Sequence, residues 1–329
     1  MTGEYAVYIN LLKTFTACFN LLVFLFLFKT KMNILLVLYF ILFLVLIIGD
    51  VSVINFVIFV LALSAYGDGN KNIKTYAYSK LIIVLIIIIS SFLFELNSNN
   101  IIYDYVRGTR FTLGFTNPNT ASMMVFDILI ALAYLYNKNK KVITISLLLI
   151  ICVNYFTDSR TVLFAYLFFL FLLFLNDKVL SFLKPIVTRM FLVFFVFSLL
   201  IAFLHETILN SFLNNRPHMY YEFLVNHSVN LFGYSKGLTR DGLIISADNS
   251  YLRILIQLGI IYFLIHSILM KKIIGKLFIG KDYLGVKIIL SILFYDIFEQ
   301  FTIAQGSVLL VFIANYLISE KMVKTKLRH

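Results

Sequence analysis

Long apolar stretches separated by short polar connections fill most of this chain. A helix needs about 20 mostly apolar residues to cross the roughly 30 Å hydrocarbon layer of a bilayer, where its backbone polar groups must bond to one another. The pattern predicts membrane-spanning helices at residues 9–28, 33–48, 51–66, 80–96, 119–136, 142–157, 161–177, 183–204, 250–270, 286–299 and 302–319. The expected fold class is all-α: a polytopic transmembrane helix bundle of about 11 spans, forming a single integral membrane domain over residues 1–329.

The composition agrees with this pattern. Hydrophobic residues make up 61% of the chain and charged residues 13%, whereas a soluble domain is about half apolar and a quarter charged. The formal net charge is +12. In a soluble protein such a charge would indicate a nucleic-acid partner, but in a membrane protein it is typical of basic cytoplasmic loops. We therefore expect the lipid bilayer as a partner and no nucleic acid.

Lysine side chains mark one side of the predicted bundle. All of them except Lys13 and Lys236 fall in every second connection or in the C-terminal tail. Cytoplasmic loops of membrane proteins carry an excess of lysine and arginine, so this side is expected to face the cytoplasm. The tail at 320–329 is then cytoplasmic, while the N-terminus and the long polar loop at about 205–250 are external.

Motifs for metals or nucleotides are missing from the sequence. Cys18 and Cys152 lie far apart inside apolar runs, as small buried hydrophobic residues do, and they form neither a disulfide framework nor a zinc pattern. No HExxH, acidic metal cluster, Walker sequence or glycine-rich nucleotide fingerprint occurs. The N-terminus lacks the features of a cleaved signal peptide, so the first apolar run should be retained. No metal and no cofactor are expected.

Arginine is distributed in the opposite way to lysine. Most arginines lie at or near the predicted external face: Arg107, Arg110, Arg160, Arg216, Arg240 and Arg253. The planar guanidinium group matches phosphate oxygens and tolerates partial dehydration better than an ammonium group does. This distribution predicts an external anionic ligand such as phosphate. Alternatively, these arginines pair with nearby aspartates or with lipid headgroups.

Two connections place polar groups at helix starts. Asn117-Pro118 predicts a helix with an asparagine N-cap and proline in its first turn, and helix N-termini bind anions; the alternative is a helix start without a ligand. The turn from Thr157 to Arg160 is so short that it should hold Arg160 at the membrane surface. There the guanidinium needs a partner, either Asp158 or a phosphate.

The long external loop holds further candidates. Asn215 could cap a helix starting at Pro217, whose apolar face would lie in the membrane interface. That helix would carry Arg216 and His218 at its start, with His218 one turn from Glu222. A lone histidine is usually a surface residue, so His218 is a reserve candidate for the base.

The sequence Asp248-Asn249-Ser250 comes directly before the span that begins near Tyr251. All three residue types favour helix N-caps, which is one interpretation. The other is that Asp248, beside Arg253 and the apolar membrane, acts as a base.

Three carboxylates inside predicted spans support a different function. Asp127, Asp296 and Glu299 lie in apolar stretches, and the last two are three residues apart on one predicted helical face. Ionisable residues within the membrane often mark transport or proton pathways. They favour the alternative of a lipid-linked oligosaccharide flippase or transporter.

The chain resembles the O-antigen and capsular polysaccharide repeat-unit polymerases (the Wzy type) and the related O-antigen ligases. The likeness covers about 105–262 and includes Gly114–Asn119, Thr157–Thr161, Arg216, Leu231–Tyr234, Asp248–Leu252 and Gly259. In the ligase branch a histidine acting as the base occupies the position of Asp248, so this difference favours a polymerase over a ligase.

The resemblance implies a GT-C-like helical fold in the bacterial cytoplasmic membrane and an undecaprenyl-diphosphate donor. It also implies metal-independent transfer of a glycan at the outer face, with a lipid-linked oligosaccharide as substrate and possible partners in a chain-length regulator and a repeat-unit flippase. Asp248 would accept the proton, and Arg160 and Arg216 would stabilise the diphosphate. The other substrate-binding candidates are Arg107, Arg110, Asn117, Asn119, Asn249, Tyr251 and Arg253.

Overall fold

A computed structural model describes residues 69–93, 101–104, 108–115, 117–136, 139–233, 239–240, 243–244, 248–300 and 307–318. The first three predicted spans lie outside these residues. Helices within this part are α4 (Gly69–Leu93), α5 (Pro118–Leu135), α6 (Lys140–Thr157), α7 (Arg160–Phe174), α8 (Asp177–Phe182), α9 (Lys184–Val187), α10 (Met190–Phe203), α11 (Ile208–Phe212), α12 (Arg216–Asn226), α13 (Ser250–Arg253), α14 (Gly259–Ile279), α15 (Tyr283–Tyr295) and α17 (Val308–Ile318). A π-helix, η1 (Ile254–Leu258), joins α13 to α14.

The described part of the protein is mostly helical, as the sequence predicts, and the strands within it are few and short. β1 (Ile101–Asp104) pairs antiparallel with β2 (Gly108–Phe111), and β3 (Thr239–Arg240) pairs with β4 (Leu243–Ile244). Among the described residues, four helices are long and apolar enough to cross a membrane: Gly69–Leu93, Pro118–Leu135, Lys140–Thr157 and the continuous Ser250–Ile279. The apolar helices α7, α10 and α15 are shorter. The membrane character of the chain is therefore supported.

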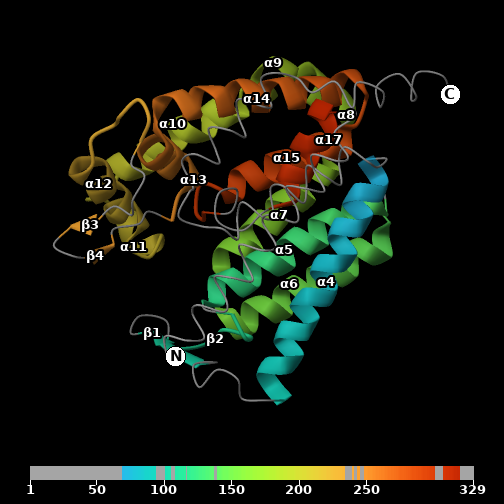
Figure 1. Ribbon diagram of the computed structural model, residues 1–329, viewed down its shortest axis with the longest axis horizontal. Helices are drawn as coiled ribbons and strands as arrows, with labels where there is room; N and C mark the ends of the chain where they lie inside the picture. The colour runs from blue at the N-terminus through green and yellow to red at the C-terminus, as the bar shows by residue number, and fades with distance from the viewer. Residues whose placement is uncertain are drawn as a thin grey trace, which may run out of the picture.

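α15 lies at the centre of the described bundle. Nearly all of its side chains are buried, on every face of the helix, as expected for a helix that is apolar all round. It packs against α7, α5, α10 and α14. α4, α5, α6 and α7 lie beside one another, while α10 and α14 run together along another side of the bundle (Figure 1).

Four predicted spans differ from the structure. The helix predicted at 80–96 begins at Gly69, and the one predicted at 250–270 continues to Ile279. The span at 183–204 divides into α9 and α10, because the amide of Arg189 bonds to the carbonyl of Ile186 and tightens the turn between the two helices. The span predicted at 286–299 starts earlier, where the Asp282 carboxylate caps the amide of Gly285. It ends at Tyr295, because the carboxylates that follow bond to other segments.

A contact between two glycines fixes the long polar loop to the helix that follows it. Gly233 and Gly259 both have positive φ, +70° and +88°, which glycine adopts at little cost. The amide of Ile260 donates to the carbonyl of Asn230 (3.0 Å), and the amide of Ile261 donates to that of Leu231 (3.2 Å). A Cβ at Gly259 would lie 2.4 Å from the amide nitrogen of Gly233. We call this contact the glycine clasp.

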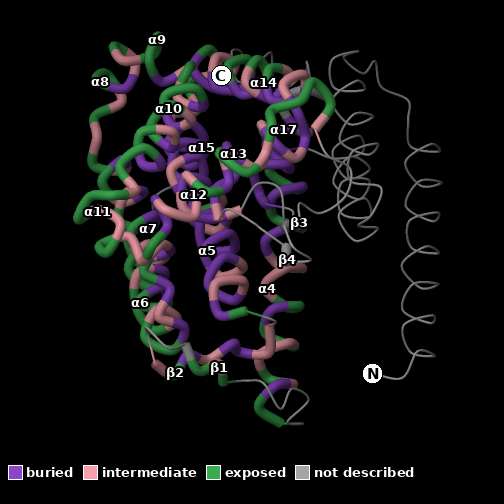
Figure 2. The backbone as a smooth tube through the Cα atoms, turned by 90° about the vertical axis from the view of Figure 1, so that its left-hand side faces the viewer, coloured by how far each residue is buried: buried purple, intermediate pink, exposed green. Residues whose placement is uncertain are grey.

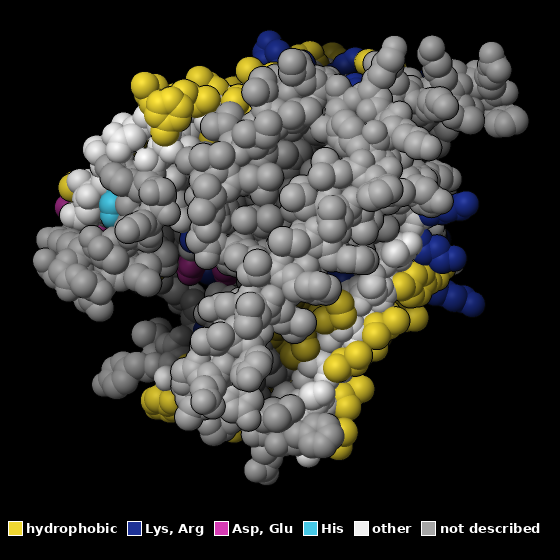
Figure 3. Space-filling view, viewed as in Figure 1, with side chains coloured by type: hydrophobic (Ala, Val, Ile, Leu, Met, Phe, Trp, Pro, Cys, Tyr) yellow, Lys and Arg dark blue, Asp and Glu magenta, His cyan; other side chains and the backbone are white. Residues whose placement is uncertain are grey.

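Basic and polar groups lie at opposite ends of the bundle. Many Lys and Arg side chains project along the top and right edge in Figure 3, beyond the start of α4 and along α8, α9 and the end of α14. β1, β2, α11, α12 and the start of α13 lie at the other end (Figure 1).

Candidate functional site

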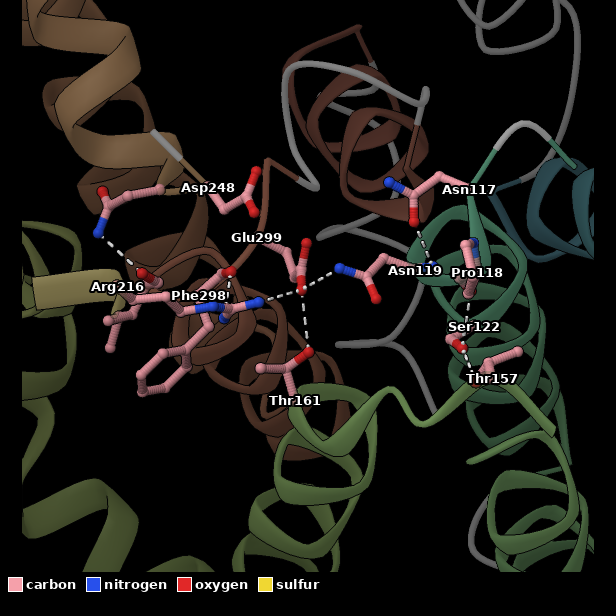
Figure 4. A network of polar contacts seen from close by, with 12 residues as sticks. Asn117, Pro118, Asn119, Ser122, Thr157, Thr161, Arg216, Asp248, Phe298 and Glu299 are labelled. Atoms are coloured by element: carbon pink, nitrogen blue, oxygen red, sulfur yellow. Dashed lines mark hydrogen bonds and ion pairs between the residues drawn. The ribbon is translucent and has the colours of Figure 1, made fainter. Parts of the chain in front are cut away.

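A polar cluster occupies the end of the bundle away from the lysines. The N-terminal ends of α5, α7, α12 and α13 meet there with the C-terminal ends of α6 and α15 (Figure 4). Helix N-termini carry partial positive charge and free N–H groups. The helix N-termini alone, without any side chain, therefore favour the binding of an anion.

Arg216 forms the strongest contact in the cluster. It is the first residue of α12, and Asn215 before it adopts a left-handed conformation that turns the chain into the helix. Arg216 Nη2 lies 2.7 Å from Glu299 Oε1, and both side chains are less than a tenth exposed (7% and 5%). Arg216 Nη1 also donates to the carbonyl oxygen of Phe298 at 2.5 Å. Both terminal nitrogens of the Arg216 guanidinium therefore bind the turn that follows α15.

Glu299 connects this arginine to the other half of the site. Its Oε1 also accepts from Thr161 Oγ1 at 3.0 Å and from Asn119 Nδ2 at 3.3 Å. Asn119 Oδ1 in turn accepts from Arg110 Nη2 at 2.7 Å. Arg110 and Arg216 are thus linked through Asn119 and Glu299. Figure 4 shows the part of this link that runs from Asn119 through Glu299 to Arg216.

Arg110 is held by the backbone as well as by Asn119. It lies on β2, is buried, and donates from Nε to the carbonyl oxygen of Thr157 at 2.8 Å. The Thr157 hydroxyl lies 2.7 Å from Ser122 Oγ, which joins the end of α6 to the first turns of α5. The predicted N-cap of α5 is confirmed, since Asn117 accepts from the amide of Asn119 at 2.8 Å.

The residues before α13 form the opposite wall. Asn249 is the N-cap and accepts from the amide of Leu252 (3.0 Å), while its Nδ2 donates to the carbonyl of Ile297 (2.8 Å). Ser250 Oγ donates to Asp296 Oδ1 (2.6 Å) and lies 2.9 Å from the carbonyl oxygen of Glu299. Asn249, rather than Asp248, is therefore the capping residue. The Asp248 side chain is partly exposed and faces the region of Glu299 (Figure 4).

The charges of the cluster shift the pKa values of its central pair. Burial alone would lower the pKa of Arg216, but Glu299, Tyr220 and Asp248 together raise it above its ordinary value, so the guanidinium stays charged. Burial raises the pKa of Glu299 by more than the charge of Arg216 lowers it, and Asp248 adds to the rise. Glu299 is thus easier to protonate than an ordinary glutamate.

Several predicted site residues lie apart from this network. The Arg160 side chain is 58% exposed and pairs with Asp158 at 3.4 Å, which matches the alternative given for it above. His218 pairs with Glu222 on the exposed side of α12, with Nε2 to Oε1 at 3.5 Å. The Nε of Arg253 donates to Gln257 Oε1. Arg107 lies outside the described residues.

Tyr251 has a structural role. It is fully buried beneath the cluster and donates from its hydroxyl to the carbonyl oxygen of Leu293 at 2.6 Å. Its ring also packs 5.0 Å from that of Phe191, centroid to centroid. Tyr251 therefore joins α13 to α15 and α10 rather than facing an opening.

The three carboxylates that favoured a transporter each bond to a different partner. Asp127 accepts from Lys80 Nζ (2.6 Å) and from the amide of Val308 (2.9 Å), which ties α4, α5 and α17 together. The prediction that Asp296 and Glu299 share one helical face is wrong, because α15 ends at Tyr295. Asp296 then bonds to Ser250, whereas Glu299 bonds to Arg216.

Sequence reasoning assigned Glu299 to the membrane interior and overlooked Thr161. Neither residue carries a local signal for this site, because Glu299 and its partner Arg216 are 83 positions apart. Thr161 belongs to the Thr157–Thr161 segment singled out for Arg160. Its place one residue after Arg160, in the first turn of α7, was the one available clue.

No family model matches this chain, and neither the curated proteins nor the solved structures contain a match. Within the described residues, no group of three histidine, cysteine, aspartate or glutamate side chains is placed to hold a metal ion.

Proposed function

We propose that this protein is a polysaccharide polymerase, a glycosyltransferase that joins undecaprenyl-diphosphate-linked oligosaccharide repeat units for a capsule, an exopolysaccharide or an O-antigen. The observation that carries the proposal is the buried chain Arg110–Asn119–Glu299–Arg216 at the bundle end opposite the lysines. Two guanidinium groups and several helix N-termini there suit a diphosphate held at a membrane surface.

The reaction needs little from the protein beyond charge and orientation. The acceptor hydroxyl oxygen forms a bond to the anomeric carbon of the donor, and the bond from that carbon to the diphosphate oxygen breaks. The electron pair leaves with the diphosphate, where Arg216 and Arg110 stabilise the added charge. The hydroxyl proton passes to Asp248, whose carboxylate is partly exposed beside Arg216. Asn117 and Asn119 orient the sugar or the diphosphate.

Glu299 has a separate task in this proposal. It holds the guanidinium of Arg216 in place through a contact of 2.7 Å. It also neutralises that charge until a diphosphate binds. Arg160, exposed at the start of α7, serves as an outer contact for the incoming anion.

The topology in this proposal has eleven spans in a GT-C-like arrangement. The C-terminus lies in the cytoplasm and the N-terminus outside. The catalytic loop at about 205–250 faces the exterior of the bacterial cytoplasmic membrane. Support comes from the four long apolar helices and from the segregation of lysine toward one end of the bundle.

Reconstitution tests this function directly. The purified protein is placed in lipid vesicles with the lipid-linked repeat unit extracted from its producing cells, and the products are separated by size. A ladder of lipid-linked oligomers supports a polymerase. Movement of the unchanged substrate across the vesicle membrane, without a ladder, would identify a flippase instead, and transfer to a different acceptor lipid would identify a ligase.

Two variants then test the site. Arg216→Lys keeps the positive charge but loses the planar fork, and we expect about a 10²–10³-fold lower rate, similar to removing one oxyanion-hole donor. Asp248→Asn should abolish the ladder with little effect on folding. The matched control is Arg189→Lys, at the opposite end of the bundle before α10, which should retain full activity. Full activity of both site variants would contradict the roles assigned to Arg216 and Asp248.

A further inference from the structure

The short helix α11 exposes apolar side chains at the same end of the molecule as the polar cluster. Ile208 and Phe212 are 89% and 72% exposed. They are four residues apart and therefore share one face of the helix. α11 contains no charged residue. Two large apolar side chains that are open to this extent on one helix face require a covering partner.

α12 was the segment expected to lie in the membrane interface, and the structure corrects this prediction. Tyr220 and Phe223, on its apolar face, are fully buried within the protein. α12 packs on α10 rather than away from the bundle. The apolar face available to an outside partner therefore belongs to α11.

The length of α10 places α11 at the depth of the outer lipid leaflet. α10 has 14 residues, about 21 Å at 1.5 Å per residue, whereas the hydrocarbon layer is about 30 Å thick. Arg189 stands at its start and needs the polar boundary there. The other end of α10 therefore stops short of the opposite boundary, so the segment that follows still lies within the lipid.

The exposed face of α11 also continues a lipid-facing surface. Leu200, Phe203 and Leu204, at the end of α10, are exposed and apolar. Viewed from the end of the molecule that carries α11 and α12, α11 lies at the outer edge of the bundle (Figure 2). Glu206, in the turn before α11, is also exposed. A charged side chain there requires water nearby. α11 therefore lies at the membrane interface rather than deep in the hydrocarbon layer.

α11 is bonded directly to the start of α12. Asn210 Oδ1 accepts from the amide of His218 at 3.1 Å, and Asn210 Nδ2 donates to Asn215 Oδ1 at 2.8 Å. The amide of Asn215 also donates to the carbonyl of Asn210 at 2.8 Å. Arg216 lies between these contacts, so a displacement of α11 would move the start of the helix that carries Arg216.

We propose that α11 is an interfacial anchor whose Ile208 and Phe212 insert among the acyl chains of the outer leaflet and thereby set the depth of Arg216 in the membrane. The partner is the lipid bilayer itself, at the level just below its headgroups. Exposed apolar area and continuity with the lipid-facing side of α10 favour lipid over a second protein. This proposal is independent of the transferase chemistry.

Tryptophan fluorescence tests the proposed insertion of α11, because the natural chain contains no tryptophan and an introduced one is the sole reporter. Phe212→Trp and Ile208→Trp are each prepared in vesicles of phosphatidylglycerol and phosphatidylethanolamine. Some vesicles contain lipids brominated at shallow or deep acyl positions. Phe171→Trp, on the exposed apolar face of α7, reports a lipid-facing position, and Glu222→Trp, on the exposed side of α12, reports a water-facing one.

We expect emission from the α11 variants to be blue-shifted, quenched by the shallow bromines and protected from aqueous iodide. Quenching by iodide without quenching by bromine would overturn the proposal, because α11 would then face water. Protection from both quenchers would overturn it as well, because a protein surface would then cover α11. Two positions are used so that one poorly folded variant does not decide the result.

Discussion

A single carboxylate oxygen, Glu299 Oε1, receives donors from three helices. They are Arg216 Nη2 of α12, Thr161 Oγ1 of α7 and Asn119 Nδ2 of α5. Such convergence opposes the effect of burial on the carboxylate, and it fixes the guanidinium that faces it. At the scale of single residues, Glu299 determines the geometry of the site.

Replacing Glu299 with glutamine should destabilise the protein strongly. The amide keeps the volume of the side chain but leaves the buried Arg216 charge without its anionic partner. Loss of one member of a buried pair costs about 3–5 kcal/mol. Reversible unfolding in mixed detergent micelles, followed by circular dichroism, measures the free energy of unfolding.

Glu206→Gln is the matched control for Glu299→Gln. Glu206 also lies near a basic group, His205, but its side chain is 88% exposed. Exposed pairs contribute little to stability, so this variant should unfold like the natural protein. Equal stability of the two variants would show that the Arg216–Glu299 contact is not a stabilising pair.

At the scale of elements, the glycine clasp positions the long polar loop. Ile260 and Ile261 lie in the first turn of α14, where the amides of a helix have no carbonyl partners within it. The carbonyl oxygens of Asn230 and Leu231 supply them from the loop. The close approach of the two backbones requires residues without a Cβ at positions 233 and 259.

Alanine at Gly259 should therefore disrupt this element. The added Cβ would lie 2.4 Å from the amide nitrogen of Gly233 and 2.5 Å from the carbonyl oxygen of Leu231, and φ is +88°. The left-handed conformation alone costs about 1–2 kcal/mol for an L-residue, and the contact with backbone atoms adds to it. We expect a lower free energy of unfolding, measured as above.

Gly275 provides the comparison within the same helix. A Cβ there meets nothing within 4 Å, and alanine favours a helix by about 1 kcal/mol over glycine. Gly275→Ala should thus leave stability unchanged or raise it. A Gly259→Ala variant as stable as Gly275→Ala would mean that the clasp is not closed in the folded protein.

Much of the helical order could be predicted from hydropathy, because α4, α5, α6 and α7 are apolar stretches bounded by polar turns. The Asn117 cap was also predictable, since its signal is local. The partners of Arg216 and Arg110 were not, because Glu299 and Thr157 approach them through the tertiary fold. The end of α15 at Tyr295 was missed because its cause, the bond from Ser250 to Asp296, is equally remote.

At the scale of the whole molecule, the placement of the lysines distinguishes one end of the bundle from the other. Lys140 and Lys141 begin α6, and Thr157 ends it beside Arg110. The start of α4 and the end of α14 also carry lysines on the same side as the start of α6. The polar cluster and α11 lie at the far end, which the positive-inside rule assigns to the exterior.

Labelling of cysteine variants in intact cells tests this orientation. In a background of Cys18→Ser and Cys152→Ser, one cysteine replaces either exposed Glu222 on α12 or exposed Lys140 at the start of α6. A membrane-impermeant maleimide added outside should label the first variant, and it should label the second only after the cells are opened. External labelling at position 140 would show that the protein has the opposite orientation in the membrane.

The glycine clasp also has a consequence for how such a protein diversifies. Gly233 is pinned to Gly259, and Ser250 is bonded to the end of α15, so the chain between them leaves and rejoins the scaffold at fixed points. A segment with fixed ends can be exchanged for one of another length or composition without repacking its supports. A different stretch grafted between positions 234 and 247 should therefore leave the packing of α13, α14 and α15 unchanged.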